Sequence, residues 1–405
     1  MTIGFYFNTP KSTGGAYQYS LLFLDALTYI KNNTYIIFNT THDIPDRFYT
    51  QKNFLILDIS GPFSTKQSRS YAHISNMLNL IVTAFLRFHM GYIVVFFYKW
   101  LRRSTLDCIN SSKTDLIVFP LTTMETFGCK IPYILAVHDL QHKVNPQFKE
   151  LTGSGQSEIR DLRYNDEVKH AFRLLAQSQC GKADIIRYYG ANPDKIRILP
   201  YSPIFSFLSK HVKGAAPKKY RLPKHYVFYP ANYWSHKNHK NLIRAIGILV
   251  KKQKEIHVIL TGTKSVDFSI QNELNREIKK LHVDTYVHHL GYLTPEELKY
   301  IYIHAIALAM PTYIGPVNLP VYEAWSLGTP VITSDIRDYR EIASDAALLI
   351  DPDSPGEIAD AIVEIQQNKK LRKKLGCHGR TIIHKRTIKN FARNVNTVFG
   401  EYINF

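Results

Sequence analysis

Short runs of β-branched and aromatic residues alternate along the chain with longer stretches in which apolar residues recur at helical spacing. Parallel strands joined by crossover helices have this pattern, so an α/β fold is predicted. The first series of predicted strands covers 3–7, 34–39, 53–57, 115–120, 133–139 and 195–200. The second series covers 225–231, 256–262, 285–291, 305–311, 329–334 and 346–351. Two such series predict two Rossmann-like domains, each built on a parallel sheet.

A segment rich in Lys, Pro and Gly, 209–225, separates the two series. This composition is typical of a linker between domains. We therefore expect an N-terminal domain over 1–205 and a C-terminal domain over 206–385. Apolar residues at helical spacing predict one further helix in the last segment, 386–405.

Basic residues outnumber acidic residues by 51 to 33, which gives the chain a net charge of +18 at pH 7. A surface this basic indicates an anionic partner, such as a nucleotide, a nucleic acid or an acidic lipid headgroup. The four cysteines are scattered without a CxxC pair, which argues against a disulfide framework and fits a reducing cytosol. Because the first residues lack a basic segment followed by an apolar one, we expect no secretory signal.

The longest apolar region, 77–103, is interrupted by polar residues and Gly91 before about 20 apolar residues accumulate. We therefore expect two helices that meet near Gly91 and no transmembrane helix. The aromatic side chains of this region could pack into the core of an α/β domain. With Lys99, Arg102 and Arg103 they could instead form a basic, aromatic surface that rests on an anionic membrane.

In open parallel sheets, ligands bind beyond the carboxyl ends of the strands, so the loops after the predicted strands are the candidate site. After the first strand, Gly14 and Gly15 either bring backbone N–H groups close to a phosphate or make a plain turn. After the fifth strand, His138 and Asp139 combine a hydrogen-bond donor, an acceptor and a carboxylate at the rim of the sheet. We interpret His138 and Asp139 as candidate catalytic residues.

In the second domain, the loop after the first strand places two lysines, Lys237 and Lys240, beside two histidines, His236 and His239. A His-x2-His zinc site would need a third ligand, and the lysines would repel the cation, so we expect no metal. A phosphate site is favoured, because the ammonium group of Lys237 would neutralise charge on a diphosphate leaving group without any cofactor.

A single acid, Glu323, lies among apolar residues in a predicted short helix, 319–327. Asn318 suits the N-cap of this helix, and Gly328 suits the position after its last turn. Backbone amides up to Leu319 would then hold phosphate oxygens, while Glu323 accepts hydrogen bonds from the vicinal hydroxyls of a ribose. The alternative role for Glu323 is a capping or surface acid.

Three segments, in this order and at this spacing, point to a known family: AVHDLQH (136–142), YPANYWSHKNHKNL (229–242) and the long segment 315–362 that begins GPVNLPVYEAWSLGTP. On these segments the chain resembles the retaining nucleotide-sugar transferases of glycosyltransferase family 4. The resemblance is strong over 225–365 and weak before residue 130.

The resemblance implies the GT-B fold, in which two Rossmann-like domains face each other across a cleft and the last helix crosses back to the N-terminal domain. It also implies roles for four residues: Glu323 contacts the ribose, Lys237 contacts the diphosphate, His138 lies near the transferred sugar, and Gly15 lies near the phosphates. Gly262, which ends the second strand of the second series, is a further candidate for donor binding.

Two positions depart from the family pattern. The family often has an acid eight residues before its glutamate, where this chain has Gly315. It also often has an arginine close to the position of Asn232, beside the lysine of the same loop. Asn232, Gly315 and Asn318 are therefore candidate donor-binding residues, and we expect the recognition of the donor sugar to be altered.

We therefore predict a retaining transferase that moves a hexosyl or deoxyhexosyl group from a nucleotide-diphosphate sugar, with GDP-mannose or a deoxysugar donor favoured. The expected acceptor is a glycan or lipid-linked glycan of surface polysaccharide or lipopolysaccharide synthesis, and the expected location is cytoplasmic, on the inner face of the membrane. A nucleotide-sugar 2-epimerase of the same fold is the alternative. A basic nucleic-acid-binding module ranks third, because the aromatic residues are not interleaved with Lys and Arg on one segment.

Overall fold

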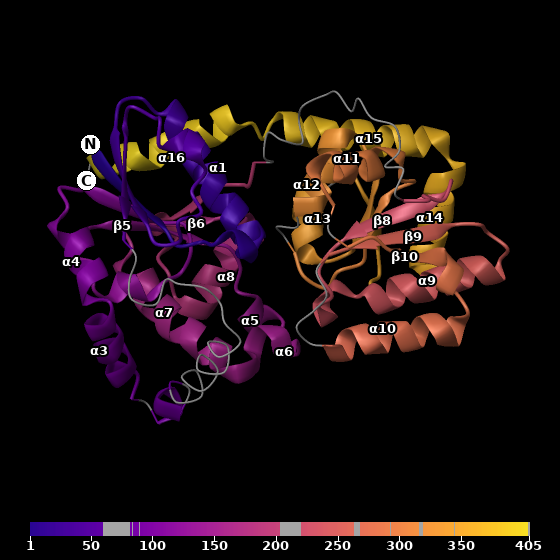
Figure 1. The fold of residues 1–405 in the computed structure, drawn as a ribbon, viewed down its shortest axis with the longest axis horizontal. Helices are drawn as coiled ribbons and strands as arrows, with labels where there is room; N and C mark the ends of the chain where they lie inside the picture. The colour runs from indigo at the N-terminus through magenta and orange to yellow at the C-terminus, as the bar shows by residue number, and fades with distance from the viewer. Residues whose placement is uncertain are drawn as a thin grey trace. The chain divides into compact units, whose positions relative to one another are not determined.

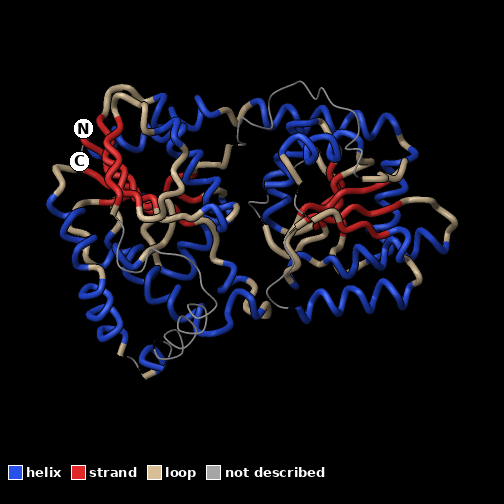
Figure 2. The backbone as a smooth tube through the Cα atoms, viewed as in Figure 1, coloured by secondary structure: helices blue, strands red, loops and turns tan. Residues whose placement is uncertain are grey.

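The computed structural model describes residues 1–59, 82, 84–88, 90–202, 220–262, 268–291, 293–315, 319–343 and 345–403. The chain divides into two compact units (Figures 1 and 2). Unit 1 consists of Met1–Tyr201 with Ile388–Phe405, and unit 2 consists of Ser202–Thr387. The expected boundary between residues 205 and 206 lies outside the described residues.

Unit 1 contains a sheet of seven strands in the order β3-β2-β1-β4-β5-β6-β7, and every neighbouring pair is parallel. The strands are β1 (Thr2–Phe7), β2 (Thr34–Asn39), β3 (Phe54–Asp58), β4 (Leu116–Phe119), β5 (Tyr133–Val137), β6 (Arg173–Ala176) and β7 (Ile196–Ile198). Six of these strands were predicted, and β6 was missed. Helices cover both faces of the sheet, which explains why its central strands are continuous buried runs.

The helices of unit 1 include the segment that ends the chain. They are α1 (Gly15–Tyr29), α3 (Gly91–Leu101), α4 (Arg103–Ser111), α5 (Gln141–Val144), α6 (Lys149–Thr152), α7 (Gln156–His170), α8 (Gln179–Tyr189) and α16 (Ile388–Ile403). Figure 1 shows α16 beside α1. The ring of Phe391 on α16 packs edge-on against Tyr19 and Phe23 of α1, with centroids 6.3 and 5.7 Å apart. Helix α16 therefore belongs to the core of unit 1.

Unit 2 contains a sheet of six parallel strands in the order β10-β9-β8-β11-β12-β13. The strands are β8 (Tyr226–Pro230), β9 (His257–Thr261), β10 (Val287–His289), β11 (Leu308–Met310), β12 (Val331–Ser334) and β13 (Leu348–Ile350). The helices are α9 (His239–Lys251), α10 (Phe268–Leu281), α11 (Pro295–His304), α12 (Leu319–Leu327), α13 (Arg337–Ala343), α14 (Pro355–Gln367) and α15 (Lys369–His384). All six predicted strands of this domain are confirmed, and so is the predicted α/β class of the whole chain.

Helix α12 is held in place by a buried tryptophan. Trp325 is completely buried, and its indole N–H donates to the carbonyl oxygen of Ala346 at 3.0 Å. Helix α15 packs so closely on this ring that a Cβ at Gly379 would lie 2.2 Å from a ring carbon. The predicted end of α12 is confirmed, since Gly328 follows it with a φ of +75°. Within the described residues, no helix is both long and apolar enough to cross a bilayer.

Candidate functional site

The loop after β8 is fastened to two other strand ends of unit 2. Asn238, which has a left-handed backbone with a φ of +55°, lies directly after the short 3-10 turn Ser235–Lys237. Its side-chain amide donates to the carbonyl oxygen of Pro311 at 2.9 Å, just after β11, and to that of Pro352 at 2.7 Å, shortly after β13. These two hydrogen bonds fix the turn at the carboxyl edge of the sheet, where ligands of parallel sheets bind.

Lys237 lies in this fixed turn. The preceding carbonyl, that of His236, accepts from the backbone N–H of Tyr313 at 2.9 Å and from the hydroxyl of Thr312 at 3.1 Å. The carbonyl of Lys237 itself accepts from the hydroxyl of Tyr229 at 2.8 Å. The half-buried Lys237 therefore has a defined backbone position beside the loop that leads from β11 toward α12.

Gly262 brings the end of β9 against the end of β8. Its φ is +142°, a region that residues with a side chain rarely adopt. A Cβ at this position would lie 2.5 Å from the carbonyl oxygen of Ala231 and 3.1 Å from the backbone nitrogen of Asn232. The close approach requires glycine, and it leaves the side chain of Asn232 exposed at the same edge of the sheet.

Glu323 lies in the middle of α12 and is only partly exposed. Its Oε2 accepts a hydrogen bond of 2.8 Å from the hydroxyl of Tyr302, a fully buried residue of α11. Burial raises the pKa of the Glu323 carboxyl to about 7, and the hydrogen bond from Tyr302 opposes this rise. Glu323 is therefore a partly exposed, oriented acid whose pKa is raised to about 7. Sequence reasoning missed Tyr302, because no motif surrounds it.

The loop before α12 explains one departure from the family pattern. A Cβ at Gly315 would lie 2.6 Å from the Cβ of the buried Asp338 on α13, so an acid would not fit here without a shift. Asn318, the expected N-cap, lies outside the described residues, and Leu319 is the first residue of α12. Asp338 was not singled out from the sequence, where nothing indicated its proximity to Gly315.

His239 is a buried packing residue. Its ring stacks on Tyr229 and lies against Tyr233, with centroids 4.7 and 4.8 Å away. Among the described residues, no group meets hydrogen-bond geometry with its ring nitrogens. Burial, together with the nearby charge of Lys237, lowers the pKa of His239 to about 3. In the part of the chain that the structure describes, no three His, Cys, Asp or Glu side chains are grouped so as to hold a metal ion.

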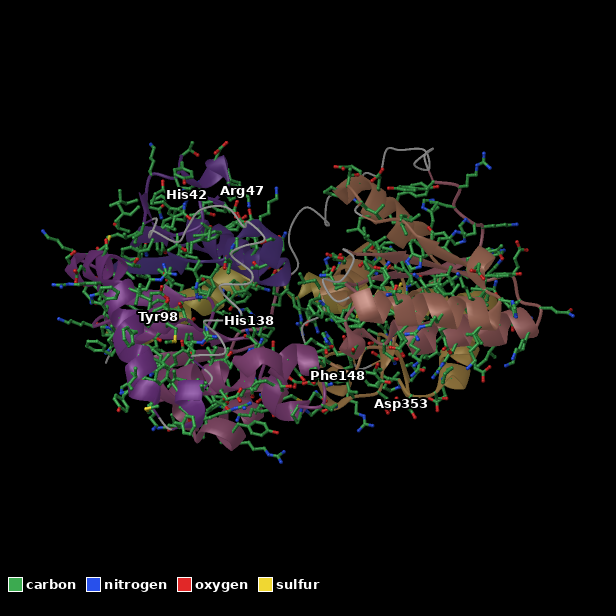
Figure 3. All side chains as sticks on the ribbon, turned by 60° about the horizontal axis from the view of Figure 1, so that its bottom comes forward. His42, Arg47, Tyr98, His138, Phe148 and Asp353 are labelled. Carbon is green, nitrogen blue, oxygen red and sulfur yellow. The ribbon has the colours of Figure 1, made fainter. Side chains whose placement is uncertain are left out.

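His138, labelled in Figure 3, follows β5 in unit 1. Both of its ring nitrogens are engaged. Nε2 lies 2.8 Å from the carbonyl oxygen of Pro120, and Nδ1 lies 2.9 Å from the side-chain nitrogen of Gln177. A neutral ring that donates from Nε2 and accepts at Nδ1 satisfies both contacts. Burial lowers the pKa of His138, which also favours the neutral form. This geometry favours a positioning role over proton transfer. Nothing in the local sequence indicates Gln177, which lies 39 residues away.

The other two residues singled out in unit 1 lie at helix starts. The exposed Asp139 accepts the backbone N–H of Gln141 at 3.0 Å, and so orders the start of α5. Gly15 begins α1, and the preceding Gly14 has the positive φ of +59°. No side chain caps α1, and both glycines are exposed, so the first amides of this 15-residue helix face solvent.

Comparisons with known proteins agree with this architecture. Residues 213–381 match the family model of glycosyl transferases group 1. O-antigen chain mannosyltransferase B of Escherichia coli is 24% identical over 52% of this chain and 57% of that protein. A D-inositol 3-phosphate glycosyltransferase of Paenarthrobacter aurescens is 23% identical over 67% of this chain and 66% of that protein. The chain thus spans less than two thirds of the length of these two relatives.

A third relative, O-antigen chain mannosyltransferase RfbU of Salmonella typhimurium, is 24% identical over 88% of both proteins. Among solved structures, Anabaena Alr3699/HepE in complex with UDP superimposes with a TM-score of 0.71 at 15% identity, over 99% of this chain and 100% of that one. A likeness at this identity shows the fold alone. The chain therefore shares the GT-B fold of such structures, and its residues 213–381 match the model of glycosyl transferases group 1.

Proposed function

We propose that the protein is a retaining glycosyltransferase that resembles family 4 and uses a nucleotide-diphosphate sugar as donor. One observation supports the proposal: Lys237 lies in the turn that Asn238 fastens at the carboxyl edge of the unit 2 sheet, and α12, which follows β11 of the same sheet, carries the acid Glu323, oriented by Tyr302. In a nucleotide-diphosphate sugar, the diphosphate would bind Lys237 and the two hydroxyls of the ribose would bind Glu323. No other ligand class discussed above matches both groups.

The chemistry needs charge stabilisation more than a protein nucleophile. As the bond between the sugar and the diphosphate breaks, negative charge grows on the leaving phosphate oxygen. Lys237 and the first amides of α12 would hold that charge, and Glu323 would fix the ribose by accepting from its two hydroxyls. The acceptor hydroxyl would attack the anomeric carbon on the face from which the diphosphate leaves, and the departing phosphate would take its proton. Configuration at that carbon is then retained.

His138 would act by position. Because Pro120 and Gln177 engage its two nitrogens, the ring of His138 would contact the transferred sugar as a rigid, neutral group. Asp139 and the exposed amides of Gly15 would contribute further polar contacts. This assignment of unit 1 groups to the sugar and phosphates rests on the family resemblance.

The favoured donor is GDP-mannose or a related deoxysugar nucleotide, with an acceptor from surface polysaccharide or lipopolysaccharide synthesis. Two of the relatives are O-antigen chain mannosyltransferases, which supports this choice. Gly315, packed on Asp338, leaves the donor sugar without the acid that the family often provides, so the amides of this loop and Asn318 would take its place. The D-inositol 3-phosphate glycosyltransferase relative makes a phosphorylated polyol the second acceptor class to test.

The anionic surface of a membrane is the proposed second partner, on the cytoplasmic side. Helix α3 buries only Val94, and four of its aromatic side chains are 54–71% exposed: Tyr92, Phe96, Phe97 and Trp100. These four side chains therefore do not pack into the core, whereas Tyr98 of the same helix donates to Oε1 of the buried Glu125 at 3.0 Å. Lys99 and Arg103 flank them, but Arg102 faces inward, with its Nε 3.7 Å from Oε1 of the buried Glu125.

A binding panel tests the donor assignment. UDP-glucose, GDP-mannose and a dTDP-deoxysugar are each added, and the unfolding temperature is measured. A donor at about 100 times its Kd should stabilise the protein by roughly 2.7 kcal/mol. Glu323→Gln should reduce the shift caused by the same donor. If no nucleotide sugar changes the unfolding temperature of the parent protein, the proposal fails.

A further inference from the structure

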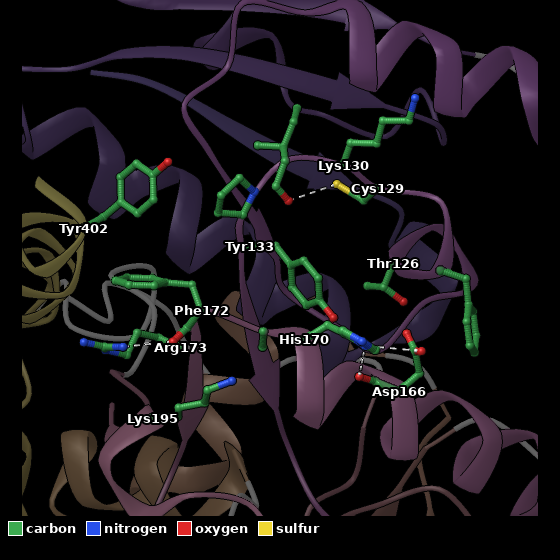
Figure 4. A pocket seen from close by; sticks show the side chains of 14 residues that line it. Thr126, Cys129, Lys130, Tyr133, Asp166, His170, Phe172, Arg173, Lys195 and Tyr402 are labelled. Carbon is green, nitrogen blue, oxygen red and sulfur yellow. Dashed lines mark hydrogen bonds and ion pairs between the residues drawn. The ribbon is translucent and has the colours of Figure 1, made fainter. Parts of the chain in front are cut away.

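Unit 1 contains a cavity of about 690 Å³ on the opposite edge of its sheet from His138 (Figure 4). The cavity is lined by Tyr133 at the start of β5, Arg173 at the start of β6, and Lys195 just before β7. His138 instead follows the carboxyl end of β5. We propose that this cavity is a second ligand site, which binds a small organic monophosphate with an aromatic body. The inference is independent of the proposed transferase activity.

The charge of the lining selects an anion. Three lining residues are cationic, namely Lys130, Arg173 and Lys195, and of these Arg173 is paired with Glu401. The lining contains one acid, Asp166, and its Oδ1 lies 3.3 Å from Nδ1 of His170. Figure 4 shows this pair on one side of the cavity and Arg173 on the other. An anionic group entering the cavity therefore meets an excess of positive charge.

Two of the cations retain unused hydrogen-bond donors. The ammonium group of Lys195 donates to the carbonyl oxygen of Lys169 at 2.8 Å, which leaves two of its three protons. No carboxylate pairs with Lys195 or Lys130 among the described residues. A phosphate, with three acceptor oxygens, matches donors of this kind better than a neutral ligand does.

The rest of the cavity wall is formed by aromatic side chains, which is why we propose a ligand with an aromatic ring. Phe172 and Tyr402 lie edge to face with centroids 5.3 Å apart, and the guanidinium carbon of Arg173 lies 4.2 Å from the centroid of Phe172. Phe127 and Tyr133 add two more rings to the lining. A flat ring would bury apolar surface against these side chains, in a cavity whose volume lies within the range of small-molecule sites.

The site also contacts the last helix of the chain. Tyr402 lines the cavity from α16, and Arg173 donates to Glu401 of the same helix at 2.5 Å. A ligand that touches Tyr402 and Arg173 would therefore stabilise the attachment of α16 to the sheet of unit 1.

The experiment uses phenyl phosphate as the probe and the full chain, with binding followed by calorimetry. Phenyl phosphate should bind at least tenfold more tightly than inorganic phosphate, and phenol should not bind measurably. Lys195→Met and Lys130→Met should each weaken phenyl phosphate at least fivefold. Lys113→Met, which removes an exposed lysine outside the cavity, should bind it like the parent, and so should Lys237→Met.

Three results would overturn the inference. Phenyl phosphate that fails to bind at about 10 mM shows that the cavity is no such site. Equal affinity for inorganic phosphate shows that the aromatic walls are not used. Loss of binding in Lys237→Met, with none in Lys195→Met and Lys130→Met, places the probe at the nucleotide-sugar site instead. The unfolding temperature of each variant without ligand identifies any loss that is due to misfolding.

Discussion

Replacing Glu323 with Gln should remove a pH dependence that the parent protein shows when it binds a nucleotide sugar. The carboxylate form accepts hydrogen bonds from both ribose hydroxyls, whereas a protonated carboxyl or an amide offers a weaker acceptor. Burial raises the pKa of Glu323 to about 7, so its binding-competent form is fractionally populated near neutral pH. The apparent affinity is reduced by that fraction.

The size of the effect follows from this pKa. With a midpoint near pH 7, about 9% of the molecules carry the carboxylate at pH 6 and about 91% at pH 8. Affinity should therefore rise about tenfold between these values, which corresponds to ~1.4 kcal/mol. Burial lowers the pKa of His239 to about 3, so its ring stays neutral in this range, and burial also lowers the pKa of His138.

Calorimetric titration with GDP-mannose and UDP-glucose at pH 6, 7 and 8 measures the effect at constant ionic strength. Both diphosphates are esterified at each end, so the ligands do not titrate in this range. Tyr302→Phe is the matched control: it removes the hydrogen bond that lowers the pKa of Glu323, so the midpoint should move to higher pH. An affinity that is constant from pH 6 to 8 in the parent, or equally pH-dependent in Glu323→Gln, would refute the reasoning.

Four further outcomes are expected. Lys237→Ala should lower kcat more than it raises KM, because the lysine acts where charge grows on the leaving group; a change confined to KM would contradict this role in steady-state assays. The free energy of unfolding should fall as the pH rises from about 4.5 to about 7, because Glu323 binds its proton more tightly in the folded protein than in the unfolded chain. Urea titrations at pH 5 and pH 8 should show a smaller fall in Glu323→Gln. Gly262→Ala should cost about 2 kcal/mol or more of stability, because its Cβ would meet a backbone carbonyl at 2.5 Å; an unchanged urea midpoint would disprove the close approach. Replacing Lys99 and Arg103 with Ser should weaken co-sedimentation with anionic vesicles and leave the weak binding to neutral vesicles as it was, and equal sedimentation of variant and parent would remove the membrane proposal.

The strands were predictable because parallel strands that are covered on both faces have sequences that are continuous apolar runs. The missed strand, β6, reads RLLA and contains no β-branched or aromatic residue, so its sequence does not separate it from the end of a helix. The end of α12 was also predictable, since Gly328 suits the position after its last turn.

The contacts that orient the candidate site were not predictable, because they join residues far apart in the sequence. Tyr302 lies 21 residues before the Glu323 that it contacts, and Asn238 holds carbonyl groups 73 and 114 residues away. The contact of Arg102 was not predictable either. In the sequence Arg102 lies beside other basic residues, which suggested a surface position, but in the structure it faces the buried Glu125. Such pairings depend on how the strands are ordered in the sheet, which local patterns do not encode.

An assay for transfer of the sugar with retention of configuration tests the proposed glycosyltransferase activity most directly. The protein is incubated with GDP-mannose or UDP-glucose and a lipid-linked glycan or polyol phosphate acceptor, and proton NMR reports both nucleotide release and the anomeric configuration of the product. We expect nucleotide release that depends on the acceptor, an α-linked product from the α-configured donor, and turnover that is strongly reduced in Lys237→Ala. A β-linked product, or a nucleotide sugar that epimerises without any acceptor, would contradict the proposed activity.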